Sequence, residues 1–211
     1  MPTPPLHQTI SLRLTAGAAV ALALLTFTAC GDPPDDNGTD VDTGDYAIGE
    51  EGPAGGIIFF EDSDDDYDFT YLEAAAEDYT PDGGEPIFSW AAGHSDAFFM
   101  EITASEVGTG ESNTERIVAE LEEDEQTGRA AQIAADYDGG DHSDWFLPSE
   151  GELQLMYDNL HAEGLGDFRD DNYWSSTEFD INYARSLNFN SGDWHDWTKT
   201  FREYVRPIRA F

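Results

Sequence analysis

The strongest constraint on the fold lies at residues 144–149, where a short apolar run ends at a proline and a serine. The run is Trp-Phe-Leu at 145–147, and Pro148 stops it. Ser149 is typical of a helix N-cap, and Glu152 three residues later completes a capping box. One face of the helix that follows carries the apolar side chains of Leu153, Met156, Tyr157 and Leu160. The pattern predicts a buried strand end that turns sharply into an amphipathic helix, against which the rest of the chain packs.

The N-terminal segment has the pattern of an export signal. Residues 14–29 carry no charge and are rich in Ala and Leu, and Arg13 is the one basic residue before them. An uncharged run of about 16 residues is shorter than the roughly 20 needed to cross a bilayer. The sequence therefore predicts a signal peptide over residues 1–29 and no transmembrane anchor.

The segment after the signal predicts a lipid anchor. Residues 27–30, Phe-Thr-Ala-Cys, resemble the lipobox of bacterial lipoproteins, in which a small residue precedes the cysteine that is lipidated. Cys30 is the chain's single cysteine, so no disulfide can form within the mature monomer. Residues 30–45 are rich in Asp, Gly and Pro and predict an acidic linker, which leaves one domain over residues 46–211. Gly31 after the cysteine favours the outer membrane or cell surface as the destination.

The charge of the chain is strongly negative, −36 from 45 acidic and nine basic residues. Signal cleavage removes Arg13 and leaves eight basic residues, a net charge of −37. Such a field repels nucleic acids and anionic membrane surfaces, so membrane association is expected through the lipid only. Adaptation of the surface to a saline habitat is the preferred interpretation, and cation binding is the alternative.

One acidic loop has the spacing of a calcium site. It consists of Asp62, Asp64, Asp66, Asp68 and Glu73, which occupy positions one, three, five, seven and twelve of an EF-hand count. Tyr67 stands where the sharp turn requires glycine, and a strand precedes the loop where an EF-hand has a helix. The default interpretation is a solvated loop without a cofactor, and a looser calcium contact remains open.

Hydrophobic patterns predict the remaining elements. Strands are expected at 55–60, 87–90, 173–176, 184–189 and 204–209. A short helix is expected at 72–77, and a longer one from residue 113 or 114 that breaks near Gly128 and continues to 137. Trp145 and Trp174 are expected in the core.

The order of several short motifs resembles the Lcl C-terminal domain family, named after a bacterial collagen-like adhesin. These motifs occupy residues 52–60, 72–75, 108–114, 144–149, 173–178 and 205–211. The resemblance implies an α+β, C-type-lectin-like fold over 46–211, in which two helices flank antiparallel strands and the last strand lies beside the first. It also implies occurrence on lipoproteins and surface proteins.

No catalytic constellation emerges from the sequence. Sulfatase-modifying relatives of this fold need catalytic cysteines or copper, and a lipidated Cys30 cannot serve. The Asp-His-Ser-Asp run at 141–144 is explained by turn polarity, because residues adjacent in sequence rarely form a triad. The histidines are dispersed without the spacing of metal ligands. The sugar-binding motifs of calcium-dependent lectins are absent.

The segment 188–199 is the candidate ligand-binding loop. It places two tryptophans among polar side chains, a mixture typical of surfaces that recognise proteins or sugar rings. The alternative is a hairpin whose tryptophans cap the core. The candidate residues are Asn188, Asn190, Asp193, Trp194, His195, Asp196, Trp197 and Lys199.

These features together favour a non-catalytic binding or adhesion module that is anchored by lipid to a bacterial envelope. Its expected partner is an extracellular or periplasmic protein or glycan, bound through the C-terminal loops. A passive structural envelope domain and an enzyme with an unrecognised site are the alternatives.

Overall fold

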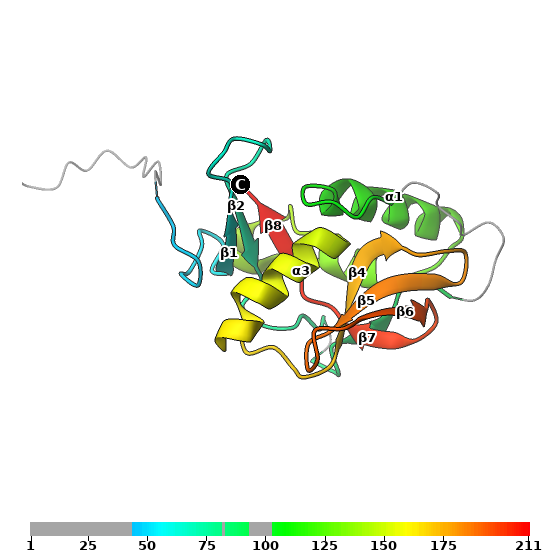
Figure 1. The fold of residues 1–211 in the computed structure, drawn as a ribbon. Coiled ribbons are helices and arrows are strands. Elements are labelled where there is room, and N and C mark those ends of the chain that lie inside the picture. The colour runs from blue at the N-terminus through cyan, green and yellow to red at the C-terminus, as the bar shows by residue number, and fades with distance from the viewer. Residues whose placement is uncertain (1–43, 82, 93–102) are drawn as a thin grey trace, which may run out of the picture. The chain divides into compact units, whose positions relative to one another are not determined.

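The computed structural model describes residues 44–81, 83–92 and 103–211, all within one compact unit, Asp42–Phe211. The unit is an α+β domain with two β-sheets (Figure 1). Its helices are α1 (Gly110–Glu123), α2 (Ala130–Ala135) and α3 (Glu150–Asn159), with 3₁₀ turns at Gly139–Asp141 and His161–Glu163. The α+β class predicted from the sequence is confirmed.

Helix α3 begins where the sequence predicts. The Ser149 hydroxyl accepts a hydrogen bond from the Glu152 amide at 3.3 Å, and the Glu152 carboxylate accepts one from the Ser149 amide at 2.7 Å. Leu153, Met156 and Leu160 are fully buried. Just before the helix, Phe146 exchanges backbone hydrogen bonds with Ile208 near the C-terminus. The capping box and the apolar face are confirmed.

The Glu152 carboxylate also joins α3 to α1. Its Oε1 accepts hydrogen bonds from the amides of Gly108 at 2.8 Å and Gly110 at 3.4 Å. Gly110 opens α1, so the N-termini of two helices converge on one fully buried carboxylate. A side chain at Gly110 would clash with this carboxylate, which explains the glycine there. The arrangement is favourable because free amides and the positive end of a helix both attract negative charge.

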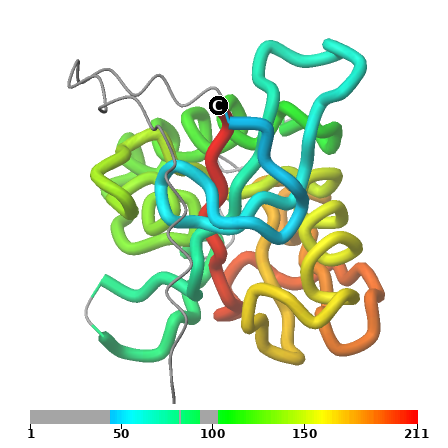
Figure 2. Tube along the Cα trace, turned by 90° about the vertical axis from the view of Figure 1, so that its left-hand side faces the viewer, coloured from blue at the N-terminus to red at the C-terminus, as the bar shows by residue number. Residues whose placement is uncertain are grey.

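The smaller sheet has the order β1-β2-β8, with β1 at Ile57–Glu61, β2 at Tyr71–Ala74 and β8 at Ile208–Ala210. The first and last strands therefore share a sheet, but β2 lies between them, and the expectation that they are direct neighbours is wrong. The last strand does run close to the start of the domain (Figure 2), where the rings of Tyr46 and Phe211 lie 5.7 Å apart.

The helix predicted at 72–77 is also wrong, because β2 occupies the first half of this segment and no helix follows it. Leu72 and Ala74 are fully buried, and β2 pairs with β1 on one side and β8 on the other. Glu73 is buried too, and its Oε1 lies 3.0 Å from Nη1 of Arg209. Two neighbouring strands and a distant cation thus outweigh the local helix propensity of Leu-Glu-Ala-Ala.

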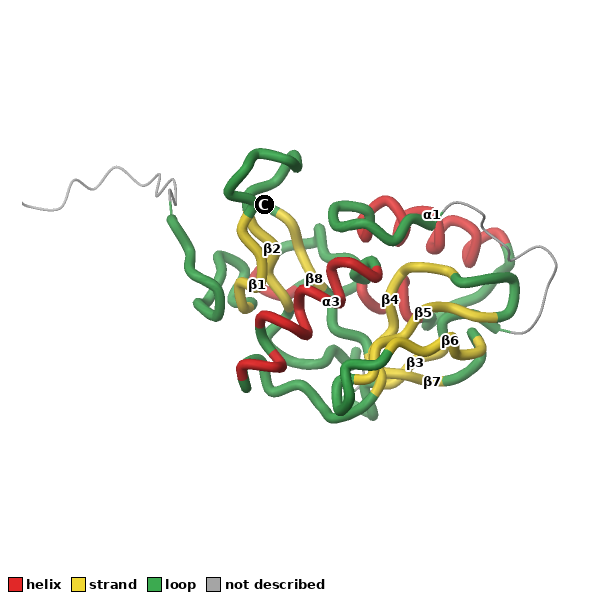
Figure 3. The backbone as a smooth tube through the Cα atoms, in the orientation of Figure 1, coloured by secondary structure: helices red, strands yellow, loops and turns green. Residues whose placement is uncertain are grey.

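The larger sheet has the order β3-β7-β4-β5-β6 (Figure 3). Its strands are β3 (Ile87–Ser89), β4 (Asn172–Glu178), β5 (Tyr183–Asn188), β6 (Trp194–Thr198) and β7 (Arg202–Tyr204). Most pairs are antiparallel, but β4 and β7 pair in parallel. The sheet is therefore mixed, where antiparallel strands alone were expected.

The predicted strand at 204–209 is two strands in different sheets. The chain leaves β7 at Tyr204 and enters β8 at Ile208, and Pro207 lies in the crossing. Proline interrupts a strand because it has no amide hydrogen for the ladder. Arg206, also in the crossing, is 1 % exposed and forms an ion pair with Asp78.

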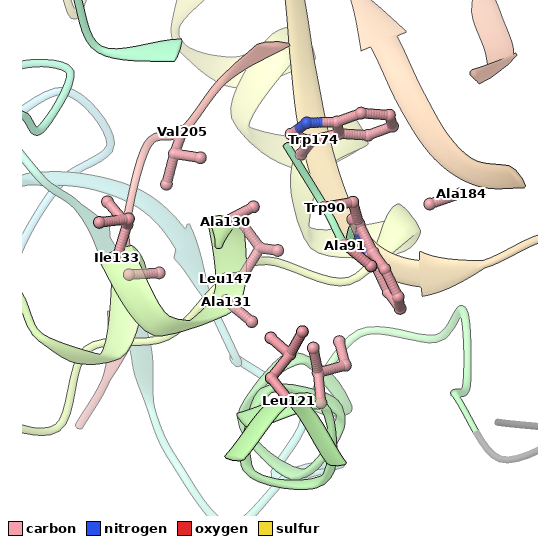
Figure 4. Close-up of a cluster of buried hydrophobic side chains, with 12 residues drawn as sticks. Trp90, Ala91, Leu121, Ala130, Ala131, Ile133, Leu147, Trp174, Ala184 and Val205 are labelled. Atoms are coloured by element: carbon pink, nitrogen blue, oxygen red, sulfur yellow. The ribbon is translucent and has the colours of Figure 1, made fainter. Parts of the chain in front are cut away.

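Alternation along the large sheet sends side chains into two cores. Trp174 and Ala184 point to the face covered by α1 and α2, where their cluster includes Trp90, Leu121 and Val205 (Figure 4). The other face meets α3 and the small sheet; its cluster contains Tyr173, Leu187, Phe189, Met156, Phe59 and Ile208. The prediction that Trp145 and Trp174 are core residues is confirmed, at 3 % and 0 % exposure.

The predicted helical region 113–137 is two helices. Helix α1 starts three residues earlier than expected, at Gly110, and buries Ile117 and Leu121. Gly128 adopts φ +67°, a conformation that breaks the helix, before α2 begins at Ala130. The predicted break is confirmed.

Candidate functional site

The candidate loop 188–199 forms the turn and the second strand of the β5–β6 hairpin, and Asn188 holds that turn. The Asn188 side-chain oxygen accepts hydrogen bonds from the amides of Asn190 and Ser191, both at 3.0 Å. Gly192 supplies the positive φ of the turn, +74°. Asn188 thus shapes the turn, while Asn190 and Asp193 are exposed at its tip.

Trp194 faces α3 on one side of strand β6. Its indole nitrogen donates to the Gln154 side chain at 2.8 Å, and the Arg185 guanidinium lies 5.1 Å from its ring centroid. Arg185 also pairs with Glu150 at 2.8 Å and Asp196 at 2.6 Å. The bonds to Glu150 and then Asp196 raise the pKa of Arg185 against its burial. Trp194 and Asp196 are therefore engaged within the domain.

Trp197 lies on the opposite face of β6, since it stands three positions after Trp194 and successive side chains of a strand alternate between faces. Its ring centroid lies 5.7 Å from His195 and 5.2 Å from Phe201. His195 and Trp197 are partly exposed and Phe201 is 47 % exposed. We call His195, Trp197 and Phe201 the aromatic edge, because β6 is the last strand of its sheet. The inner part of Trp197 packs against the core.

Lys199 is not a surface residue, which corrects its assignment to a ligand-binding loop. It is 2 % exposed and forms an ion pair with the equally buried Glu178. Its ammonium also lies 4.8 Å from the Trp90 ring centroid. Burial lowers the pKa of Lys199, and the Glu178 carboxylate opposes this shift. Lys199 thus joins the β6–β7 turn to the end of β4.

The predicted site is therefore divided between two ends and two faces of the hairpin. Asn188, Asn190 and Asp193 lie at the turn, and Trp197 lies near the far end of the five-residue strand. That far end carries aromatic side chains the sequence analysis did not select: Phe179 at 54 %, Tyr183 at 36 % and Phe201 at 47 % exposure. In the sequence, each of these residues is a large aromatic side chain in or beside a polar turn. That pattern indicates a shared surface only once the β4–β5 and β6–β7 turns are known to be adjacent.

The acidic loop does not gather its carboxylates around one point. Asp62 is turned inward, and its Oδ2 accepts the Tyr67 amide at 2.9 Å. This bond lowers the pKa of Asp62. Glu73 lies in β2, bound to Arg209, and the other three aspartates are exposed. Among the residues the structure describes, no three Asp, Glu, His or Cys side chains form a group that could hold a metal ion.

Glu203 in β7 has a buried carboxyl with a raised pKa. It is 9 % exposed, and its pKa is raised from 4.5 to about 7 by burial and then by the negative charge of Asp171. The folded state therefore binds the proton more tightly than the unfolded chain. Its contribution to stability is complete below about pH 4.5 and is lost as the pH rises to about 7.

We expect Glu203→Gln to remove this pH dependence. At pH 8 the variant should be more stable than the parent by about 1 to 3 kcal/mol, because no buried charge forms. At pH 4.5 the two should have nearly equal free energies of unfolding. Urea denaturation at both pH values measures the difference, and the exposed Glu163→Gln is the control. If variant and parent have equal free energies of unfolding at pH 8, the raised pKa is not that of Glu203.

The predicted signal peptide and Cys30 lie outside the described residues. Within the part of the chain that the structure describes, no helix is long and apolar enough to span a membrane.

Comparisons with known proteins give little similarity. No protein-family model matches the chain, and no curated protein matches it. Among solved structures, a fimbrial protein from Bacteroides ovatus aligns with a TM-score of 0.46 and 16 % identity. The alignment covers 67 % of this chain and 36 % of the fimbrial protein.

Proposed function

We propose that this chain is a lipid-anchored binding module of a bacterial envelope, exported by residues 1–29 and attached through Cys30. Its α+β domain is of the C-type-lectin-like kind implied by the Lcl C-terminal domain resemblance. It recognises an extracellular protein or glycan without catalysis, through the aromatic edge. The acidic surface, net −37 after cleavage, makes nucleic acid an unsuitable partner.

The observation that carries this proposal is the exposure of aromatic rings at one end of the large sheet. Three tryptophans, Trp90, Trp145 and Trp174, are at most 3 % exposed, as packing of the core requires. Of the six large hydrophobic side chains exposed among the described residues, Phe201 belongs to the aromatic edge. Phe179 and Tyr183 flank the adjoining β4–β5 turn. Rigid rings that stay at the surface beside polar groups are typical of protein and sugar recognition.

The double variant His195→Ala/Phe201→Ala tests the aromatic edge. A glycan array and a pull-down from envelope extracts first identify a ligand of the purified chain. The variant should then bind that ligand at least about tenfold more weakly, since a stacked ring contributes on the order of 1 kcal/mol. Its free energy of unfolding should change by less than about 1 kcal/mol, because both side chains are partly exposed. Binding and chemical denaturation are measured on the same preparation.

Tyr67→Ala is the matched control, because Tyr67 is an aromatic residue of similar exposure, 38 %, in the loop between β1 and β2. It should retain full affinity. If the double variant keeps full affinity for the ligand, the aromatic edge is not the binding surface. If the parent protein binds nothing in either screen, the result favours a passive structural domain.

Anchoring is tested by Cys30→Ser in a bacterial host. The variant should lose membrane association completely, because the chain has no second thiol that could carry lipid. Fractionation after a high-salt wash separates lipid anchoring from charge-dependent association. A variant that remains in the washed membranes would refute the lipoprotein assignment.

A further inference from the structure

A hollow separate from the aromatic edge lies between α1 and residues 143–146, the segment that leads into α3. Its volume is about 380 Å³, within the roughly 300–1,000 Å³ of known ligand pockets. The apolar part of its lining is Val118, Ala119, Ala135, Trp145 and Phe146. Trp145 and Phe146 are at most 4 % exposed, so the floor is the outer surface of the packed core.

The rim of this hollow is acidic. Glu111, Glu115 and Glu122 of α1 line it, and Asp144 lies on the other side. The spacing of the glutamates, i, i+4 and i+11, places them along one helix face. Asp144 is paired with Arg209 at 2.7 Å, whereas the structure shows no ion pair for the three glutamates among the described residues. Among the residues that the structure describes, no Lys or Arg lines the hollow.

The carboxylates on this rim repel one another. Burial, followed by the charges of Glu115 and Asp144, raises the pKa of Glu111. A cation that entered the hollow would reduce this repulsion. A single metal ion fits poorly, because Glu111 and Glu122 are separated by 11 helical residues, about 16 Å of helix. Several Lys or Arg side chains along one flexible peptide can span that separation.

We propose that this hollow binds a basic peptide segment of a partner protein. Its Lys or Arg side chains meet Glu111, Glu115 and Glu122, and an apolar side chain rests on Val118 and the outer surface of Trp145. The apolar stems of Lys and Arg also suit such a floor. This site depends on neither the aromatic edge nor the lipid anchor, so it stands if those assignments fail.

The experiment compares two synthetic peptides of equal charge on the full chain at physiological salt. One alternates Lys with Leu and the other Lys with Ser, and fluorescence anisotropy gives each Kd. The Lys-Leu peptide should bind at least about tenfold more tightly, because leucine buries apolar area. The variant Glu111→Gln/Glu115→Gln/Glu122→Gln should weaken its binding by about tenfold or more.

A second triple variant separates this site from general attraction to an acidic chain. Glu123→Gln/Asp124→Asn/Glu125→Gln makes the same charge change just outside the hollow and should weaken binding less than about twofold. Ala119→Trp should fill the hollow without a charge change and abolish the preference for the Lys-Leu peptide. The proposal is overturned if both triple variants lose the same affinity, or if the two peptides bind equally well. It is also overturned if neither peptide binds, or if Ala119→Trp leaves the preference for the Lys-Leu peptide unchanged. Thermal melts check that every variant is folded.

Discussion

Asp78→Asn is expected to destabilise the domain by about 3 to 5 kcal/mol, because it leaves a buried guanidinium without its counter-charge. The Asp78 carboxylate lies 2.8 Å from both Nε and Nη2 of Arg206. It also accepts the Tyr173 hydroxyl at 3.0 Å. Burial and the Asp78 charge raise the pKa of Tyr173, so its hydroxyl stays a donor. Chemical denaturation measures the loss in the free energy of unfolding.

The ion pair between Arg185 and Asp196 provides the control. The Asp196 side chain is 37 % exposed, compared with 7 % for Asp78. Asp196→Asn should therefore cost less than about 1 kcal/mol. Adding Arg206→Met to Asp78→Asn should recover part of the loss, since the unpaired charge is then removed. Equal effects of the two Asp→Asn substitutions would mean that the Asp78 pair is solvated.

Glu152→Ala should cost about 3 to 5 kcal/mol, since it leaves three backbone amides without an acceptor, two of them in buried residues. The amides belong to Ser149, Gly108 and Gly110, so the substitution removes the α3 cap and the link to α1 together. Burial raises the pKa of Glu152, against the effect of these hydrogen bonds. Glu152→Gln should cost less, because its single amide oxygen can still accept from one of the two sides.

Asp158→Ala is the matched control on the same helix. Asp158 is exposed, and its carboxylate accepts a hydrogen bond from the Gln154 side chain. Its removal should change the free energy of unfolding by about 0.5 kcal/mol or less. Hydrogen exchange adds a second measurement, because Glu152→Ala should reduce protection at the starts of both α1 and α3. Loss of protection in α3 alone would mean that Glu152 caps one helix only.

Residues close in sequence predicted much of the local structure. The capping box needs only Ser149 and Glu152, and the apolar spacing of Ile117 and Leu121 marks the buried face of α1. Short patterns likewise predicted the break at Gly128 and a strand at 55–60, which the structure places at Ile57–Glu61. Such features depend on backbone geometry within one or two helical turns, which the local sequence encodes directly.

The errors in the predicted fold arose where distant residues decide the local conformation. The segment 72–77 has helical propensity, but β1, β8 and Arg209 make it a strand. Arg209 lies 136 residues from its partner Glu73, so no local pattern contains this interaction. The same holds for residues 204–209, which divide between two sheets at Pro207.

The candidate binding site shows the same limit. The sequence selected 188–199 as one loop because tryptophans and polar residues alternate there. Pairing with β5 sends Trp194 and Trp197 to opposite faces, and burial removes Lys199 from the surface. Phe201 reaches Trp197 only because the chain folds back through the β6–β7 turn.

The sequence by itself thus predicted the cap of α3 and the apolar faces of α1 and α3, which the structure confirms. Export and lipidation of the N-terminus stay predictions from the sequence. The tertiary structure alone decided which aromatic rings stay exposed and which acids are paired with arginine. It also decided which acids around the hollow beside α1 have no ion pair among the described residues. The physical reason is that exposure and ionic pairing depend on neighbours brought together from distant parts of the chain. Helix caps and amphipathic spacing depend on neighbours only a few residues away.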